Sequence, residues 1–202
     1  MTPSVAPLRE LPAGTLLARL HLTTGAHPMA WNSWRTHGPL AIGRFDHHPP
    51  PAGDHPRHGV IYAALASERR VDPLTQCLAE VFQRDRTITL QRATPTFTLF
   101  ELARDTTLLD LRSTFEPTLA RTSTQQWARE AFASTRAADG VLYPSALIGG
   151  PGVHPAATGV CLWRRRASCL PPRPLFSRPL IDPALRGAVE RAAHELDFLL
   201  VA

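Results

Sequence analysis

The irregular order of strand-like and helix-like segments restricts the fold of this chain more than any other sequence feature. Short segments rich in apolar, β-branched or aromatic residues favour strands at 15–22, 59–64, 86–91, 96–102, 106–111, 139–147 and 158–163. Apolar residues at helical spacing favour helices at 71–85, 122–137 and 181–200. Because the two types do not alternate as in βαβ units, we expect an α+β fold, with an irregular mixed β-sheet core flanked by helices.

Two of the helical segments begin with the same signal. Asp72-Pro73 and Asp182-Pro183 each place a capping side chain before a proline, which predicts a helix start at both positions. In the remaining segment, Ser123 and Gln126 have the spacing of a capping box. The apolar stripe predicted for residues 71–85 consists of Leu74, Cys77, Leu78, Val81 and Phe82.

The composition is that of a folded protein with an excess of positive charge. The 202 residues are 44% hydrophobic and 19% charged, which suits one domain with its own core and argues against a mainly disordered chain. All 22 basic residues are arginine, and the net charge of +5 permits a polyanionic partner. The dense basic run at residues 164–166 is interpreted as a solvated edge rather than a direct nucleic-acid interface.

Cysteine usage and the N-terminus indicate the compartment. The three cysteines are scattered and form no C-x-x-C pair, which favours reduced thiols over a disulfide scaffold or a zinc knuckle. The first residues lack the basic and apolar regions of a signal peptide, and no apolar run approaches the length of a membrane span. We therefore expect a cytoplasmic protein that does not contact membranes.

The stretch "GRFDHHPPPAGDHPRHGVIYAA", residues 43–64, could be a metal site, an anion site or a plain loop. It contains His47, His48, His55 and His58, and imidazole is a common zinc ligand. Adjacent histidines rarely bind one ion together, and prolines stiffen the segment between the two pairs. We therefore expect no metal and interpret the histidines as loop residues. The nucleotide-binding glycine motifs and the nucleophile motifs are also missing from the sequence.

A set of polar residues at the ends and edges of the predicted strands remains. Arg19 and His21 share one face of residues 15–22, and Arg44 follows a glycine in a loop. Tyr62 lies in the next strand, Glu80 in the first helix and Ser145 at the end of "GVLYPS". Taken singly, each of these residues has an ordinary structural interpretation, such as a solvated face, a core tyrosine or a turn serine.

The order of four short motifs resembles the RES-domain family, which is named for an arginine, a glutamate and a serine. The motifs are "RFD", "VIYAA", "LAEVF" and "GVLYPS", and the resemblance runs from about Arg19 to about Trp163. It divides the chain into a loosely held N-terminal arm at 1–14 and a RES-like NAD-binding catalytic domain at 15–168. Residues 169–202 would form an Arg/Pro-rich connection and a C-terminal helix packed on the domain, outside the resemblance.

The resemblance implies a toxin of a bacterial toxin–antitoxin pair. Such toxins have a fold similar to ADP-ribosyltransferases and degrade NAD⁺, their substrate rather than a bound cofactor, by breaking the nicotinamide–ribose bond. The implied catalytic residues are Glu80 and Arg44. The implied NAD-binding residues are Arg19, Arg44, Tyr62, Ser145 and His21. Many members carry a tyrosine soon after the first arginine, and here His21 is the nearest side chain on that face.

Each implied residue type suits this chemistry. A pair of arginines can bind the diphosphate of NAD⁺ through charge-assisted hydrogen bonds, and a tyrosine face can hold the cationic nicotinamide. Loss of nicotinamide leaves an oxocarbenium-like ribose, which a carboxylate stabilises as the charge develops. Because the leaving group is already cationic, the reaction requires no strong general acid.

Two other interpretations stay open. The same donor site would serve an ADP-ribosyltransferase acting on a protein or a small molecule, since the acceptor is not encoded in these residues. A basic nucleic-acid-binding module would show steep salt dependence and no loss of NAD⁺. The RES resemblance further implies a cognate antitoxin with a helix-turn-helix DNA-binding part, and a homodimer is a further possibility.

Overall fold

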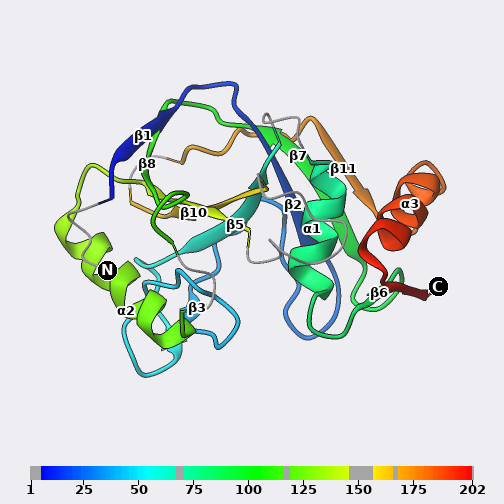
Figure 1. Cartoon of the computed structure of the whole chain (residues 1–202), viewed down its shortest axis with the longest axis horizontal. Coiled ribbons are helices and arrows are strands. Elements are labelled where there is room, and N and C mark those ends of the chain that lie inside the picture. Colours follow the sequence, from blue (N-terminus) through cyan, green and yellow to red (C-terminus); the bar gives the residue numbers. More distant parts are fainter. Residues whose placement is uncertain (1–5, 67–70, 116–118, 146–156, 166–167, 202) are drawn as a thin grey trace.

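The computed structural model describes residues 6–66, 71–115, 119–145, 157–165 and 168–201 (Figure 1). Its centre is an eight-stranded sheet in the order β1-β8-β9-β10-β5-β2-β7-β11. Neighbouring strands are antiparallel except β8 and β9, which are parallel. The strands are β1 (Leu8–Leu11), β8 (Thr106–Asp110), β9 (Gly140–Pro144), β10 (Thr158–Trp163), β5 (Val60–Leu65), β2 (Leu16–Leu22), β7 (Pro95–Glu101) and β11 (Phe176–Pro179).

One helix connects the two parallel strands β8 and β9, and the other two accompany the sheet without connecting parallel neighbours in it. They are α1 (Pro73–Phe82), α2 (Arg121–Ser134) and α3 (Arg186–Leu196), and α2 and α3 lie at opposite ends of the sheet (Figure 1). β12 (Leu199–Val201) pairs in parallel with β6 (Thr87–Thr89), and β3 (His37–Gly38) pairs with β4 (Gly53–Asp54). The predicted α+β class, with a mixed sheet and flanking helices, is confirmed.

Both faces of the sheet are buried. On one face, α1 and α3 pack over β2, β5 and β7, while α2 packs over β8, β9 and β10. On the other face, Leu17, Ile61 and Phe100 belong to a separate cluster, against which Trp31 and Trp34 pack. The sequence predicted one core face for residues 15–22 and one face carrying a cation and an imidazole. In the structure that second face is also buried, because the chain after β2 folds back over it.

The predicted helix start is confirmed for α1, whereas the predicted start of α3 and the predicted cap of α2 are wrong. The carboxylate of Asp72 accepts a hydrogen bond of 2.8 Å from the backbone N–H of Leu74. Asp182 makes the equivalent contact with Ala184, but this closes a turn, and α3 begins at Arg186. The predicted capping box of α2 is not formed, since α2 has no side-chain cap. On α1, Val81 does not join the apolar stripe and is 45% exposed.

Segments near both ends of the chain contribute strands that the sequence did not predict. Leu8–Leu11, within the expected N-terminal arm, forms β1 and pairs with β8. Phe176–Pro179, within the expected C-terminal connection, forms β11 and pairs with β7. Residues 146 and 147 of the predicted strand 139–147 lie outside the described residues. Within the described ranges, none of the helices has both the length and the apolar character that a membrane crossing needs.

A divergence between β2 and β5 creates the space for the site. β2 pairs with β7 along its whole length, but it pairs with β5 only at Leu17↔Leu65 and Ala18↔Ala64. Beyond this point Arg35, from the long segment after β2, takes the edge of β5 and forms an isolated bridge with Val60. A notch is therefore left in the middle of the sheet, next to residues 61–63 of β5.

Candidate active site

A cavity of about 650 Å³ opens at this notch. Its walls come from β2, β5, the start of α2, one side of α1 and the loop that ends at Arg44. A volume of this size suits a small-molecule ligand. The charged side chains that line it are Arg19, Arg35, Arg44, Arg84, Arg121 and Glu80.

The structure brings most of the residues implied by the sequence to this one place. Arg19, Arg44, Tyr62 and Glu80 all line the cavity, although they come from four separate segments. Ser145 reaches the site through Glu80 rather than through the cavity wall. One carboxylate and several guanidinium groups therefore surround this cavity.

The carboxylate of Glu80 is fixed by a serine. The hydroxyl of Ser145, at the end of β9 and fully buried, donates a hydrogen bond of 2.5 Å to Oε1 of Glu80. Glu80 lies on the side of α1 that faces the cavity, so the hydrogen bond orients its carboxylate there. The sequence could place Ser145 at the end of a strand and Glu80 in the first helix, but it could not indicate that they bind each other.

Arg19 is a buried cation held by backbone carbonyls. Its Nη1 donates to the carbonyl oxygens of Trp31 at 2.6 Å and Ser33 at 3.3 Å. Burial, and next the positive charge of Arg35, lower the pKa of Arg19 to about 10. The guanidinium remains charged at neutral pH, and it lies in a position where a negative ligand would be favourable.

Arg44 occupies another part of the cavity. Its Nη1 donates to the carbonyl of Leu119 at 3.2 Å, and its guanidinium lies 5.9 Å from the ring centre of Phe115. Burial and the nearby charge of Arg121 lower the pKa of Arg44, while the negative charge of Glu80 acts in the opposite direction. Arg44 is therefore on the Glu80 side of the site.

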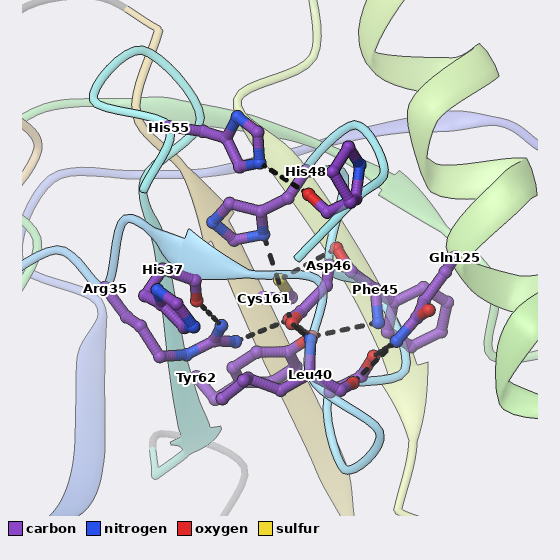
Figure 2. Close-up of polar contacts among 12 residues, drawn as sticks. Arg35, His37, Leu40, Phe45, Asp46, His48, His55, Tyr62, Gln125 and Cys161 are labelled. Atoms are coloured by element: carbon purple, nitrogen blue, oxygen red, sulfur yellow. Dashed lines mark hydrogen bonds and ion pairs between the residues drawn. The ribbon is translucent and has the colours of Figure 1, made fainter. Parts of the chain in front are cut away.

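The hydroxyl of Tyr62 is fully used within the protein. It donates to Oδ1 of Asp46 at 2.8 Å and accepts from the backbone N–H of Phe45 at 2.9 Å (Figure 2). Burial raises the pKa of Tyr62 well above its usual value. Tyr62 can therefore present its ring to a ligand, but its hydroxyl is not free to act as an acid or a base.

Asp46 and Arg35 are part of the site and were missed as site residues in the sequence. Asp46 is fully buried, and its Oδ1 lies 2.5 Å from Nη2 of Arg35 while its Oδ2 accepts from the N–H of Leu40 at 3.0 Å (Figure 2). A Cβ at Gly43 would overlap the Asp46 carboxylate, so the close turn requires glycine. The sequence carries no signal for this contact, because it forms across an irregular loop.

The loop that carries Arg44 is also held by a glutamine of α2. Nε2 of Gln125 donates to the carbonyl oxygens of Leu40 and Gly43, each at 2.7 Å (Figure 2). The loop that carries Arg44 is therefore connected both to β5, through Tyr62, and to α2.

His21 is near Arg19 in β2 but is not one of the residues that line the cavity. It is 6% exposed, and burial together with the charge of Arg19 lowers its pKa to about 4. The side chain is consequently a neutral, buried imidazole. The assignment of His21 as an NAD-binding residue stays a prediction.

The interpretation of the histidines after Arg44 as plain loop residues is incomplete. His47 and His48 are fully buried, and the ring of His47 stacks on Phe132 at 4.0 Å. Burial is the largest factor lowering the pKa of His47 to about 2 and that of His48 to about 4. His48 is therefore neutral, and its 3.9 Å contact with Asp46 is not an ion pair at neutral pH. Within the described ranges, no group of His, Cys, Asp and Glu side chains is arranged to hold a metal ion.

A comparison with models of protein families identifies the family of this chain. The RES domain model matches residues 16–177. The chain belongs to the RES-domain family. Membership associates it in general with toxin–antitoxin systems and with NAD-processing activity. No match was found among curated proteins or among solved structures.

The match also changes the extent of the RES domain. The resemblance seen in the sequence ended at about Trp163, and residues from Cys169 onward were expected to lie outside it. The family match continues to residue 177 and so includes the first residues of β11. The family match therefore covers the large sheet except for β1 and the last residues of β11, together with both helices that border the cavity.

Proposed function

We propose that this RES domain is a toxin that degrades NAD⁺ by cleaving the bond between nicotinamide and ribose. The observation that carries the proposal is the cavity itself, in which the Glu80 carboxylate, held by Ser145, stands among five arginines. Such a site suits a ligand with negatively charged phosphates and a reacting centre that becomes positive.

The proposed reaction needs one carboxylate and no metal. The C1″–N bond breaks, and nicotinamide leaves with the bonding electron pair as a neutral molecule. The ribose carbon becomes oxocarbenium-like, and Glu80 stabilises its positive charge. Water then bonds to C1″ and loses a proton, which gives ADP-ribose. If inorganic phosphate attacks instead, the product is ADP-ribose 1″-phosphate.

The other residues have binding roles in this proposal. Arg19 and Arg44 contact the diphosphate and ribose region through charge-assisted hydrogen bonds. The ring of Tyr62 packs against the nicotinamide, which fits a tyrosine whose hydroxyl is already bonded to Asp46 and Phe45. Ser145 orients the carboxylate of Glu80 through its hydrogen bond to Oε1.

The test is NAD⁺ consumption by the purified protein, with nicotinamide and all ADP-ribose products identified. Glu80→Gln keeps the shape of the side chain and removes its charge, and it should lower the rate by about 10²–10³-fold. Glu130→Gln, an exposed position near the far end of α2, is the matched control and should retain full activity. Undiminished turnover in Glu80→Gln would refute the role of this residue.

Product analysis also separates the alternative functions. Transfer of ADP-ribose to a protein or a small molecule would identify an ADP-ribosyltransferase that uses the same donor site. Salt-dependent binding of nucleic acid with no loss of NAD⁺ would instead support a basic binding module.

We further propose that a protein partner controls the activity, because an enzyme that depletes NAD⁺ harms its own cell. The RES family suggests a helix-turn-helix antitoxin encoded beside the toxin, with a segment that occupies the cavity. A carboxylate of that segment could take the place of the diphosphate between the arginines. Expression in bacteria, with and without the neighbouring gene, should give growth arrest and NAD⁺ depletion only without it. Harmless expression of the toxin alone, with unchanged NAD⁺, would refute this.

A further inference from the structure

Four of the five arginines of the cavity form two pairs according to their charged neighbours. Arg44 interacts electrostatically with Arg121 and Glu80. Arg19 interacts instead with Arg35, and the positive charge of Arg35 helps to lower the pKa of Arg19. Buried Arg19 and partly buried Arg35 both line the cavity where β2 and β5 diverge, and Nη1 of Arg19 contacts the carbonyl of Ser33, two residues before Arg35.

The position of Arg35 is fixed by both its backbone and its side chain. Its backbone N–H and C=O each form a hydrogen bond of 3.0 Å with Val60. Its Nη2 lies 2.5 Å from Oδ1 of Asp46, and its Nη1 donates to the carbonyl of His37 at 2.6 Å. The side chain is only 19% exposed. A guanidinium held in this way loses little conformational freedom when it binds a ligand.

Asp46 cannot neutralise both arginines. Oδ1 of Asp46 accepts from Arg35 and Tyr62, and Oδ2 accepts from the backbone of Leu40. Arg19 forms no ion pair with any residue of the described ranges. Buried Arg19 and partly buried Arg35 are therefore opposed by one buried carboxylate, and an excess positive charge remains at the cavity wall. Burying such a charge is unfavourable unless an anion binds to it.

From this geometry we infer that Arg35 is a phosphate-binding residue, which together with Arg19 binds the diphosphate of the substrate, and that Asp46 is the positioning residue that holds it. The inference rests on the proposed function, because the diphosphate is that of NAD⁺. It pairs Arg19 with Arg35 at the diphosphate and leaves Arg44 beside Glu80, at the reacting end.

The remaining donors of Arg35 match this ligand. A guanidinium carries five N–H groups, and the contacts with Asp46 and His37 use one on each terminal nitrogen. Because its planar fork fits the oxygens of a phosphate, the remaining donors can bind two of them at once. Charge-assisted hydrogen bonds of this kind typically change affinity by about 10- to 100-fold.

The first experiment measures binding without turnover, with ADP-ribose as the probe. The double variant Arg35→Gln/Asp46→Asn removes both charges of this ion pair, so that neither member is left charged without the other. We expect its affinity for ADP-ribose in calorimetry to fall by about 10- to 100-fold. The matched control is Arg104→Gln/Asp139→Asn, which removes a partly buried ion pair of 3.2 Å between two residues that do not line the cavity.

The control should bind ADP-ribose as the wild type does, even if its thermal stability falls. Wild-type affinity in Arg35→Gln/Asp46→Asn, an equal loss in the control, or no binding of ADP-ribose by the wild type would each overturn the inference. If ADP-ribose binds through Arg35 but NAD⁺ is not consumed, the proposed function fails while the phosphate-binding role stands.

The second experiment separates binding from positioning. Arg35→Lys keeps the charge without the fork, so it should raise KM for NAD⁺ and leave kcat within about threefold of the wild type. Asp46→Asn keeps Arg35 but weakens its anchor, so it should raise KM less than the double variant does. A fall of kcat with unchanged KM in both variants would show that these residues act on the chemical step or on the fold, and would overturn the assigned roles.

Discussion

Acidification should destabilise this protein strongly, because three buried histidines are neutral in the folded state. His21, His47 and His48 are at most 6% exposed, and burial is the largest factor that lowers their pKa values to about 4, 2 and 4. In the unfolded chain each has an ordinary pKa of about 6.5. Below that value the unfolded state binds protons that the folded state does not, so stability is lost as the pH falls from about 6.5 towards 4.

The size of the effect follows from these shifts. At pH 5 the solution is about 1.5 units below the pKa of an unfolded histidine, which corresponds to about 2 kcal/mol for each imidazole that stays neutral when folded. Three such residues together amount to about 6 kcal/mol. Domains are usually stable by only about 5–15 kcal/mol, so the loss is a large part of the total.

The assay is urea unfolding at pH 7.5 and pH 5.0. The free energy of unfolding of the wild type should be lower at pH 5.0 by several kcal/mol. His47→Phe keeps an aromatic ring against Phe132 and removes one titrating group, so the difference between the two pH values should shrink by about 2 kcal/mol. His194→Gln, at an exposed position of α3, is the control and should behave as the wild type. An equal pH difference in His47→Phe and the wild type would refute the reasoning.

Three further results are expected. Arg44→Ala should raise KM for NAD⁺ by about 10-fold or more, whereas Arg57→Ala, in the same loop but outside the cavity lining, should not; equal kinetics in the two variants would contradict the assignment. Ser145→Ala should lower kcat by about 10-fold with little change in KM, because Glu80 loses its 2.5 Å hydrogen bond, and an unchanged kcat would argue against this orienting role. Treatment with a chelator should leave NAD⁺ consumption intact, and a stoichiometric metal whose removal abolishes activity would contradict the proposed metal-free reaction.

The sequence predicted the parts of the fold that depend on local pattern. The strands at 59–64 and 158–163 and the start of α1 follow from runs of apolar residues and from the Asp72-Pro73 signal. β1 and β11 were not predicted, because their four residues mix polar and apolar side chains and form strands only by pairing with β8 and β7. Edge strands of this kind depend on a neighbouring strand rather than on their own composition.

The candidate site was predictable only as a set of residue types. The motif order identified Arg19, Arg44, Tyr62 and Glu80, which line one cavity in the structure. It could not identify Arg35, because the role of Arg35 depends on a buried carboxylate eleven residues away and on a bridge to Val60.

The burial of His47 and His48 was also missed, because histidines in a proline-rich loop are ordinarily solvated. Here the loop folds inward against Phe132 and Trp163. This outcome is set by tertiary packing and not by the local sequence.

Where β2 diverges from β5, the shape of the cavity and its charge come from different parts of the structure. The notch is made by the path of the backbone, where β2 leaves β5 after Ala18 and Arg35 takes over the edge at Val60. Its charge, in contrast, comes from single side chains on separate segments. Arg84 and Arg121, which form no hydrogen bond or ion pair through their side chains with the described residues, can therefore be exchanged one at a time without closing the cavity. We therefore expect substitution of a single arginine to alter the charge of the pocket while the path of the backbone preserves its shape.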